Sequence, residues 1–339
     1  MLIFAGNMID EINKINELIS CKKKIVITTH RSPDGDALGS SLALYNLLIS
    51  LDYDCHVIVP NDYAKFLSWL PGNNDVIIYE NEKEKSKNII KDTELIIILD
   101  LNNLNRLGEE LGIIVGESNS KKILIDHHQD PDNSIADIII SKPDICSTGE
   151  IVFDIISKLK LLNKVNTKIA KCLYVAIMTD TGSFKYRSTS SHTHLIVSKL
   201  ISYNIEHENI HSLIYDSNSI NRIKLLGYCL NEKLLLFPEN KSAIISLTER
   251  ELNEFNFQKG DTEGIVNYPL SIKNIIFSIL IVEKDGVVKL SLRSKGSFKV
   301  NTIAKKYFNG GGHTNASGGI SYVSVNDTIN ILKKIIKTI

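Results

Sequence analysis

The sequence predicts an α/β fold: an N-terminal domain built on a parallel sheet with helices on both faces, followed by a smaller C-terminal α/β domain. Three observations support this prediction. Short runs rich in isoleucine, leucine and valine alternate with amphipathic segments, as in buried parallel strands joined by helical crossovers. The chain has 339 residues, which exceeds the usual size of one hydrophobic core. A second set of strand-like runs begins only after residue 240.

The first domain contains five apolar runs of strand length, which are residues 25–29, 55–59, 76–79, 95–99 and 123–125. Helical patterns lie between them. Leu38, Leu42, Tyr45 and Ile49, for example, are spaced three or four apart and therefore share one helix face. From Cys146 the pattern becomes helical, and we expect helices to continue to about residue 230.

The second domain is expected after the stretch 231–240, which contains Pro238. Three further runs predict its strands, at residues 243–247, 275–282 and 287–292.

Charge and cysteine content restrict the function. The 39 basic residues balance 39 acidic ones, so the chain lacks the positive charge with which proteins bind long nucleic acid, and we expect no long duplex as a partner. The five scattered cysteines suit reduced thiols in the cytoplasm. Residues 1–8 are too short for a membrane anchor and lack a basic leading segment, and no later apolar run has membrane-spanning length, so no membrane partner is expected.

Polar residues directly follow three of the expected strands. They are His30 after the first run, Asp100 after the fourth, and Asp126, His127 and His128 after the fifth. Ligands of open parallel sheets bind beyond the carboxyl ends of the strands. We therefore expect these side chains to converge on one site.

The segment after the first strand adds two carboxylates to this site. Pro33 and Gly35 predict a tight loop that holds Asp34 and Asp36 near His30. Crowded carboxylates repel one another unless cations neutralise them, and hard divalent ions accept carboxylate and imidazole ligands. The alternative is an ordinary turn at Asp34 and a helix cap at Asp36.

Each of the other residues also has a simpler explanation. Asp100 alone could cap the next helix, and Asp180 alone could end the apolar helix before it. The adjacent His127 and His128 are stronger candidates, because two imidazoles at the end of an apolar strand are costly to bury without a metal or charged partner.

Taken together, the segment 30–40, Asp100, the Asp126-His127-His128 triplet and Asp180 resemble, in order and spacing, the four motifs of the DHH phosphoesterase family. This resemblance implies two divalent metal ions, Mn²⁺ first and Mg²⁺ as the alternative. His30 and Asp34 would hold one ion, Asp36, His127 and Asp180 the other, and Asp100 would bridge both. Asp126 would orient the histidines, and His128 would face the substrate phosphate.

Other segments extend the resemblance over nearly the whole chain. Residues 310–319, with Gly311, Gly312 and His313, and the segment around Arg293 are similar to the substrate-binding motifs of the DHH-associated C-terminal domain. A glycine-rich bend is the alternative for the former. Arg106 matches a recurring family arginine that could contact substrate, or it is a solvated helix charge. The implied domains are 1–216 (catalytic), 217–232 (helical linker) and 233–339 (substrate-binding).

The resemblance points to the nanoRNase and pAp phosphatase subgroup. It implies hydrolysis of short oligoribonucleotides to mononucleotides, and of 3′-phosphoadenosine 5′-phosphate (pAp) to AMP, by a hydroxide that bridges the two metals, with the substrate held across an interdomain cleft. A phosphodiesterase for cyclic or linear dinucleotides is the first alternative. A manganese-dependent pyrophosphatase and a catalytically silent nucleotide or RNA binder are weaker ones. A homodimer is left open.

Overall fold

The computed structural model describes residues 3–20 and 24–338. The chain divides into two compact units, Met1–Ser217 and Asn218–Ile339, and each is described by itself. Within the described residues, no helix combines the length and apolar character needed to cross a membrane.

The N-terminal unit is built on a six-stranded sheet in which all neighbouring strands are parallel, in the order β3-β2-β1-β4-β5-β6. Its strands are β1 (Ile25–Thr29), β2 (Cys55–Val59), β3 (Val76–Ile78), β4 (Leu95–Leu99), β5 (Lys121–Asp126) and β6 (Ile138–Ser141). The predicted parallel sheet is confirmed. The expected strands did not include β6.

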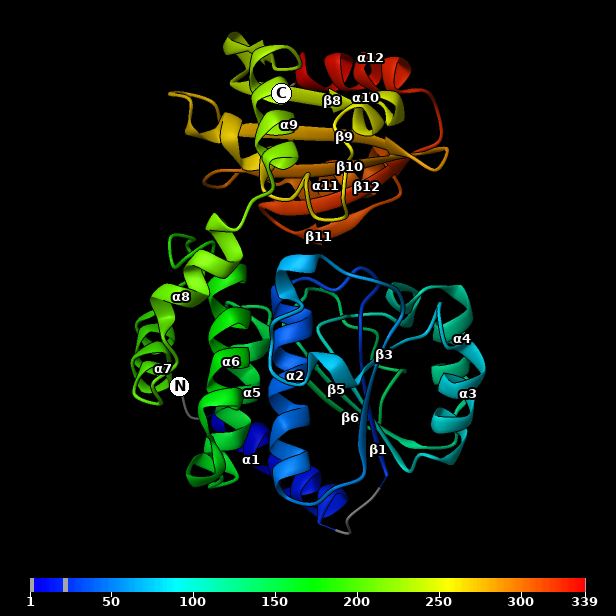
Figure 1. Cartoon of the computed structure of the whole chain (residues 1–339), viewed down its shortest axis with the longest axis vertical. Coiled ribbons are helices and arrows are strands. Elements are labelled where there is room, and N and C mark those ends of the chain that lie inside the picture. Colours follow the sequence, from blue (N-terminus) through cyan, green and yellow to red (C-terminus); the bar gives the residue numbers. More distant parts are fainter. Residues whose placement is uncertain (1–2, 21–23, 339) are drawn as a thin grey trace. The chain divides into compact units, whose positions relative to one another are not determined.

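Helices cover both faces of this sheet, as predicted (Figure 1). Side chains alternate along β1: Ile25 and Ile27 face one core, and Val26 faces the other. The first core lies beneath α1 (Ile3–Ile19), α2 (Gly35–Ser50), α5 (Thr148–Lys158) and α6 (Thr167–Asp180). The second lies beneath α3 (Lys83–Asp92) and α4 (Glu109–Glu117). Helices α7 (Ser191–Ile201) and α8 (His207–His211) complete the unit.

Helices α2 and α6 pack closely, and this contact matters for the site because both helices carry site residues. A Cβ on Gly39 of α2 would lie 2.7 Å from the backbone oxygen of Cys172 on α6. A Cβ on Gly35 would lie 2.3 Å from Oγ1 of Thr179. Only glycine allows the two backbones to approach this closely.

The C-terminal unit is a mixed six-stranded sheet in the order β11-β12-β10-β9-β8-β7, in which only the β8–β9 pair is parallel. The strands are β7 (Leu235–Phe237), β8 (Ser242–Leu247), β9 (Phe277–Lys284), β10 (Val287–Ser294), β11 (Gly311–His313) and β12 (Ala316–Ser321). The predicted second α/β domain is confirmed. The glycine-rich segment, for which a bend was the alternative, forms the β11–β12 hairpin.

Two layers of helices cover this second sheet. α11 (Val300–Tyr307) and α12 (Val325–Ile336) share a core with Leu290 and Leu292 of β10. On the other side, α9 (Ile220–Asn231) and α10 (Glu249–Glu254) share a core with β8. Leu225 and Cys229 of α9 are fully buried there, so this helix, which falls in the segment expected to link the domains, contributes to the core of the C-terminal unit.

Candidate metal centre

The sheet brings the predicted strand-end residues together, because β1, β4 and β5 are neighbours. Asp100 lies between two histidines. Its Oδ2 is 3.4 Å from Nε2 of His30, and its Oδ1 is 3.4 Å from Nε2 of His127. All three residues are buried, with exposed fractions of 2–6%. The left-handed backbone of Asp100, with φ of 59°, is uncommon outside glycine and marks a constrained position.

The two aspartates of the first loop have different roles. Asp34 is the N-cap of α2, and its Oδ1 accepts hydrogen bonds from the backbone N–H groups of Asp36 and Ala37. Its Oδ2 lies 3.9 Å from Nε2 of His30. The cap is therefore Asp34 rather than Asp36. Asp36 lies in the first turn of α2, is 1% exposed, and places Oδ2 3.7 Å from Nε2 of His127.

Asp180 is the last residue of α6, and its carboxylate also faces the metal centre. Its Oδ2 lies 3.3 Å from Nε2 of His127. With Asp36 and Asp100, three carboxylates therefore surround this one nitrogen.

The hydrogen bonds of the histidines show why a cation fits here. Nδ1 of His30 lies 2.9 Å from the carbonyl oxygen of Arg31, and Nδ1 of His127 lies 3.2 Å from that of Ile145. Carbonyl oxygens only accept, so each Nδ1 carries a proton, and in the neutral form of each ring the lone pair of Nε2 faces carboxylate oxygens. Acceptors that face each other in this way require a proton or a metal ion between them.

Burial and neighbouring charges shift the pKa values of the aspartates and histidines in this centre. Burial, together with the nearby carboxylates of Asp100 and Asp180, raises the pKa of Asp36 well above its usual value. Burial opposes ionisation of Asp100 too, but the hydrogen bond from His30 and the charges of the three imidazoles lower its pKa. Burial disfavours the charged forms of His30 and His127, but the surrounding carboxylates outweigh it, so both pKa values are raised. The centre therefore attracts positive charge.

Asp100 belongs to three groups of potential donor atoms. The first adds His30 and Asp34, the second adds Asp36 and His127, and the third adds Asp126 and His128; within each group the donor atoms lie within 4.8 Å of one another. Acidic and histidine side chains are thus positioned to hold metal, and imidazole with carboxylate is a donor set that divalent cations accept.

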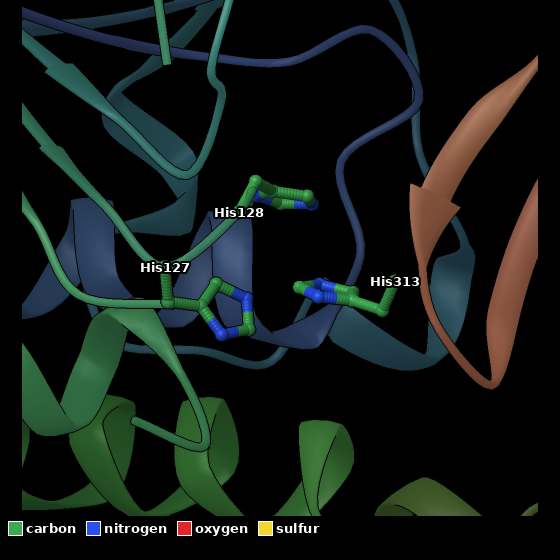
Figure 2. A group of neighbouring side chains, drawn as sticks. All are labelled: His127, His128 and His313. Atoms are coloured by element: carbon green, nitrogen blue, oxygen red, sulfur yellow. The ribbon is translucent and has the colours of Figure 1, made fainter. Parts of the chain in front are cut away.

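His128 belongs to a separate chain of hydrogen bonds. Figure 2 shows that it leaves the same loop as His127. The planes of the two rings meet at 72°. Nδ1 of His128 lies 2.7 Å from Oδ1 of Asp126, and Nη1 of Arg106 lies 2.9 Å from its Nε2. Arginine only donates, so Nε2 accepts and Nδ1–H donates to Asp126. Asp126 thus orients His128, whereas the carbonyl of Ile145 orients His127.

Sequence reasoning missed Thr148, the first residue of α5. Its backbone N–H donates to Oδ2 of Asp36 at 2.7 Å, and its hydroxyl donates to Oδ1 of Asp100 at 2.9 Å. The helix start was recognisable from Ser147 and Glu150, which have capping-box spacing. The contact with Asp36 was not, because 112 residues separate the two.

The predicted substrate-binding residues of the C-terminal unit share one face of its sheet. Arg293 on β10 and His313 on β11, which is drawn in Figure 2, both stand opposite Ala316 of β12. Directly opposed residues project to the same side, so the two side chains lie on one face, two strands apart. Lys289 and Ser291 alternate onto that face, and Leu290 and Leu292 point into the core.

The glycines of the hairpin differ in what they require. Gly312 has φ of 132°, and a Cβ there would lie 2.6 Å from the backbone oxygen of Ala316. The backbone itself therefore demands glycine. Gly311 has open space around its Cβ position among the described atoms, so packing does not explain its glycine.

Comparisons with known proteins agree with these observations. Residues 24–177 match the N-terminal domain of the DHH family, and residues 240–339 match the DHHA1 domain. A probable bifunctional oligoribonuclease and PAP phosphatase NrnA from Streptococcus mutans is 31% identical over 299 residues, which are 88% of this chain and 89% of the relative. The Bacillus subtilis bifunctional oligoribonuclease and PAP phosphatase NrnA is 28% identical, covering 90% and 91%.

A solved structure extends this likeness to the fold. The crystal structure of an exopolyphosphatase-related protein from Bacteroides fragilis is 40% identical and superposes with a TM-score of 0.92, covering 97% of this chain and 96% of that one. Two family domains in the expected order, and a relative above 30% identity over most of both chains, lead to one conclusion: this chain belongs to the DHH family.

Proposed function

We propose that this protein is a two-metal phosphoesterase that hydrolyses short oligoribonucleotides to mononucleotides and pAp to AMP. The observation that carries the proposal is the position of Asp100, whose two oxygens face two different groups of donor atoms. The names of the Streptococcus and Bacillus relatives supply the proposed substrates.

The proposed ligands follow two of these donor groups. His30 and Asp34 would hold one ion, Asp36, His127 and Asp180 would hold the other, and Asp100 would be a ligand of both. Mn²⁺ is the proposed metal, with Mg²⁺ as the alternative, because the donor set is rich in carboxylates. When bound, two such ions lower the pKa of a water molecule and neutralise charge on the phosphoryl group.

His128 and Arg106 are proposed to meet the scissile phosphate. The guanidinium of Arg106 can donate to a phosphoryl oxygen, since phosphate is a stronger acceptor than the imidazole Nε2 that it contacts now. Its departure exposes Nε2 of His128, and Asp126 stabilises the imidazolium that forms if this atom takes up a proton. His128 could then donate that proton to the leaving oxygen.

The C-terminal unit is proposed to bind the terminal phosphate of the substrate. Arg293 offers a planar fork of donors, His313 offers an imidazole on the same sheet face, and the backbone at Gly311 and Gly312 offers N–H groups. Recognition of a terminus would favour short chains.

A hydrolysis assay tests the proposal. Chelator-treated protein is given a diribonucleotide with and without Mn²⁺, and released mononucleotide is measured. We expect release only with metal, and its loss in Asp100→Asn. His192→Ala is the matched control, because its imidazole pairs with Asp154 outside the centre. Full activity in Asp100→Asn would refute the proposed centre.

The substrate class is tested in the same assay. We expect the diribonucleotide and pAp to be hydrolysed faster than cyclic diadenylate or pyrophosphate. A faster rate with cyclic diadenylate would instead assign the chain to the dinucleotide phosphodiesterases.

The proposed compartment is the reducing cytoplasm, which the buried thiols of Cys55, Cys146, Cys172 and Cys229 support. Light scattering on the same preparation tests the homodimer.

A further inference from the structure

One residue at the start of α5 contacts two carboxylates of the proposed metal centre. Thr148 is fully buried. Its hydroxyl donates to Oδ1 of Asp100 at 2.9 Å, its backbone N–H donates to Oδ2 of Asp36 at 2.7 Å, and the next N–H, of Gly149, donates to Oδ1 of Asp36 at 2.9 Å. Both oxygens of Asp36 and one oxygen of Asp100 are thus fixed by α5.

The first N–H groups of α5 are available because they have no partner inside the helix. Ser147 is the N-cap and accepts from the N–H of Glu150. That leaves the N–H groups of Thr148 and Gly149, at the positive end of the helix dipole, for the carboxylate of Asp36. Gly149 has no room for a side chain, because a Cβ would lie 2.5 Å from that of Ala176 on α6.

Buried contacts hold this helix end in place. The carboxylate of Glu150, 3% exposed, accepts hydrogen bonds from Sγ of Cys146 at 2.9 Å and from Oγ1 of Thr193 at 2.7 Å. Ile151 and Val152, which follow, are buried in the core. The hydroxyl of Thr148 is therefore presented to Asp100 from a fixed support.

The hydroxyl contact holds one of the two oxygens of the Asp100 carboxylate. With Oδ1 held by Thr148, this oxygen lies beside His127 while Oδ2 lies beside His30. Without the hydroxyl, the carboxylate could rotate about its Cβ–Cγ bond, and its two oxygens would no longer face the two donor groups at once.

We infer that Thr148 is a positioning residue that holds Asp100 in its bridging orientation and aligns it with Asp36, so that the two metal sites form one coupled pair. This inference rests on the proposed two-metal function. It assigns Thr148 no contact with substrate and no proton transfer.

Two matched pairs of variants isolate the hydroxyl. Thr148→Val replaces it with a methyl group of similar size, and Thr148→Ser keeps it. Should the valine variant fail to fold, Thr148→Ala is compared with Thr148→Ser, since these two differ only in the hydroxyl. All of them keep the backbone N–H that binds Asp36. Circular dichroism of the metal-free proteins verifies folding.

The readout is Mn²⁺ binding, measured by calorimetry on metal-free protein and by electron paramagnetic resonance. We expect wild type and Thr148→Ser to bind two ions with the spectrum of a spin-coupled pair. We expect the variant without the hydroxyl to bind at least one ion about 10–100-fold more weakly, the usual effect of removing a group that orients a metal ligand, and to give the spectrum of isolated ions. In activity assays, kcat should fall while KM stays unchanged.

Two outcomes would overturn the inference in distinguishable ways. If the variant without the hydroxyl binds a coupled pair as tightly as wild type, Thr148 does not position Asp100, and the proposed function stands. If wild type binds no Mn²⁺ pair, the proposed two-metal function itself fails.

Discussion

Asp126 accepts the Nδ1 proton of His128 across 2.7 Å, and with the arginine donor on the opposite nitrogen this fixes the tautomer of the ring. Asp126 itself is fully buried. Asp126 and His128 therefore suit the orientation of an imidazole better than the binding of a metal ion, because Nδ1 of His128, the nitrogen nearest the carboxylates, carries a proton.

Replacing Asp126 should separate metal binding from turnover. In Asp126→Asn the side-chain amide can present its N–H₂ to Nδ1, which favours the wrong tautomer. We expect kcat to fall about 10–100-fold, with two Mn²⁺ ions still bound. Calorimetry and steady-state kinetics check this. Loss of one metal ion in this variant would show instead that Asp126 is needed to form the metal centre.

The metal-free protein should lose stability as pH rises from 5.5 to 8.5. The pKa values of His30 and His127 are raised by surrounding carboxylates despite burial. Their contribution is fully present below the unfolded value of about 6.5 and is lost as pH passes the raised folded values. Asp36, whose pKa is raised by burial and by its carboxylate neighbours, acts in the same direction.

Thermal unfolding of chelator-treated protein across this range measures the effect. With saturating Mn²⁺ the trend should weaken or reverse, because metal binding releases protons and tightens as pH rises. A melting temperature that climbs with pH in the metal-free protein would contradict the assigned shifts.

Arg293 should act on substrate binding. We expect Arg293→Ala to raise KM for a 5′-phosphorylated diribonucleotide about 10–100-fold, as for a lost charged hydrogen bond, with little change in kcat. Lys289→Ala, on the same face of β10, is the matched control. The effect should vanish with a substrate that lacks the terminal phosphate. An equal defect on both substrates would argue against phosphate recognition.

Two adjacent glycines should respond differently to alanine. Gly312→Ala is expected to destabilise the C-terminal unit by roughly 1–3 kcal/mol, because its positive φ and the nearby backbone of Ala316 leave no room for a Cβ. Gly311→Ala has that room, so it should melt like wild type and instead raise KM, if a phosphate approaches its backbone. Thermal melts and kinetics of both variants decide this.

The site residues that could be predicted from the sequence are those at the ends of neighbouring parallel strands, because the sheet topology brings these ends together. His30, Asp100 and His127 follow apolar strands, and the ends of neighbouring parallel strands must meet. Asp180 needed the family resemblance, because the end of a helix does not by itself point to a distant sheet.

What could not be predicted depends on tertiary contacts with no local pattern. In the sequence, Thr148 fits the pattern of an ordinary helix start. Only tertiary packing brings it beside Asp36 and Asp100. For Arg106 we considered a substrate contact or a solvated charge; the structure adds a hydrogen bond from its Nη1 to Nε2 of His128, which no local pattern indicates. In the C-terminal unit, the expected strands did not include β7, β11 or β12.

The candidate ligands come from four separate segments of the N-terminal unit, from His30 directly after β1 to Asp180 at the end of α6. No fragment shorter than this span contains the full set, so local unfolding of any one segment removes a ligand. Metal binding is therefore linked to the cooperative folding of the unit as a whole. At a concentration one hundred times the dissociation constant, one bound ion adds about 2.7 kcal/mol to the free energy of unfolding. Slowed hydrogen exchange should then extend over the whole parallel sheet and reach helices that never touch the ion.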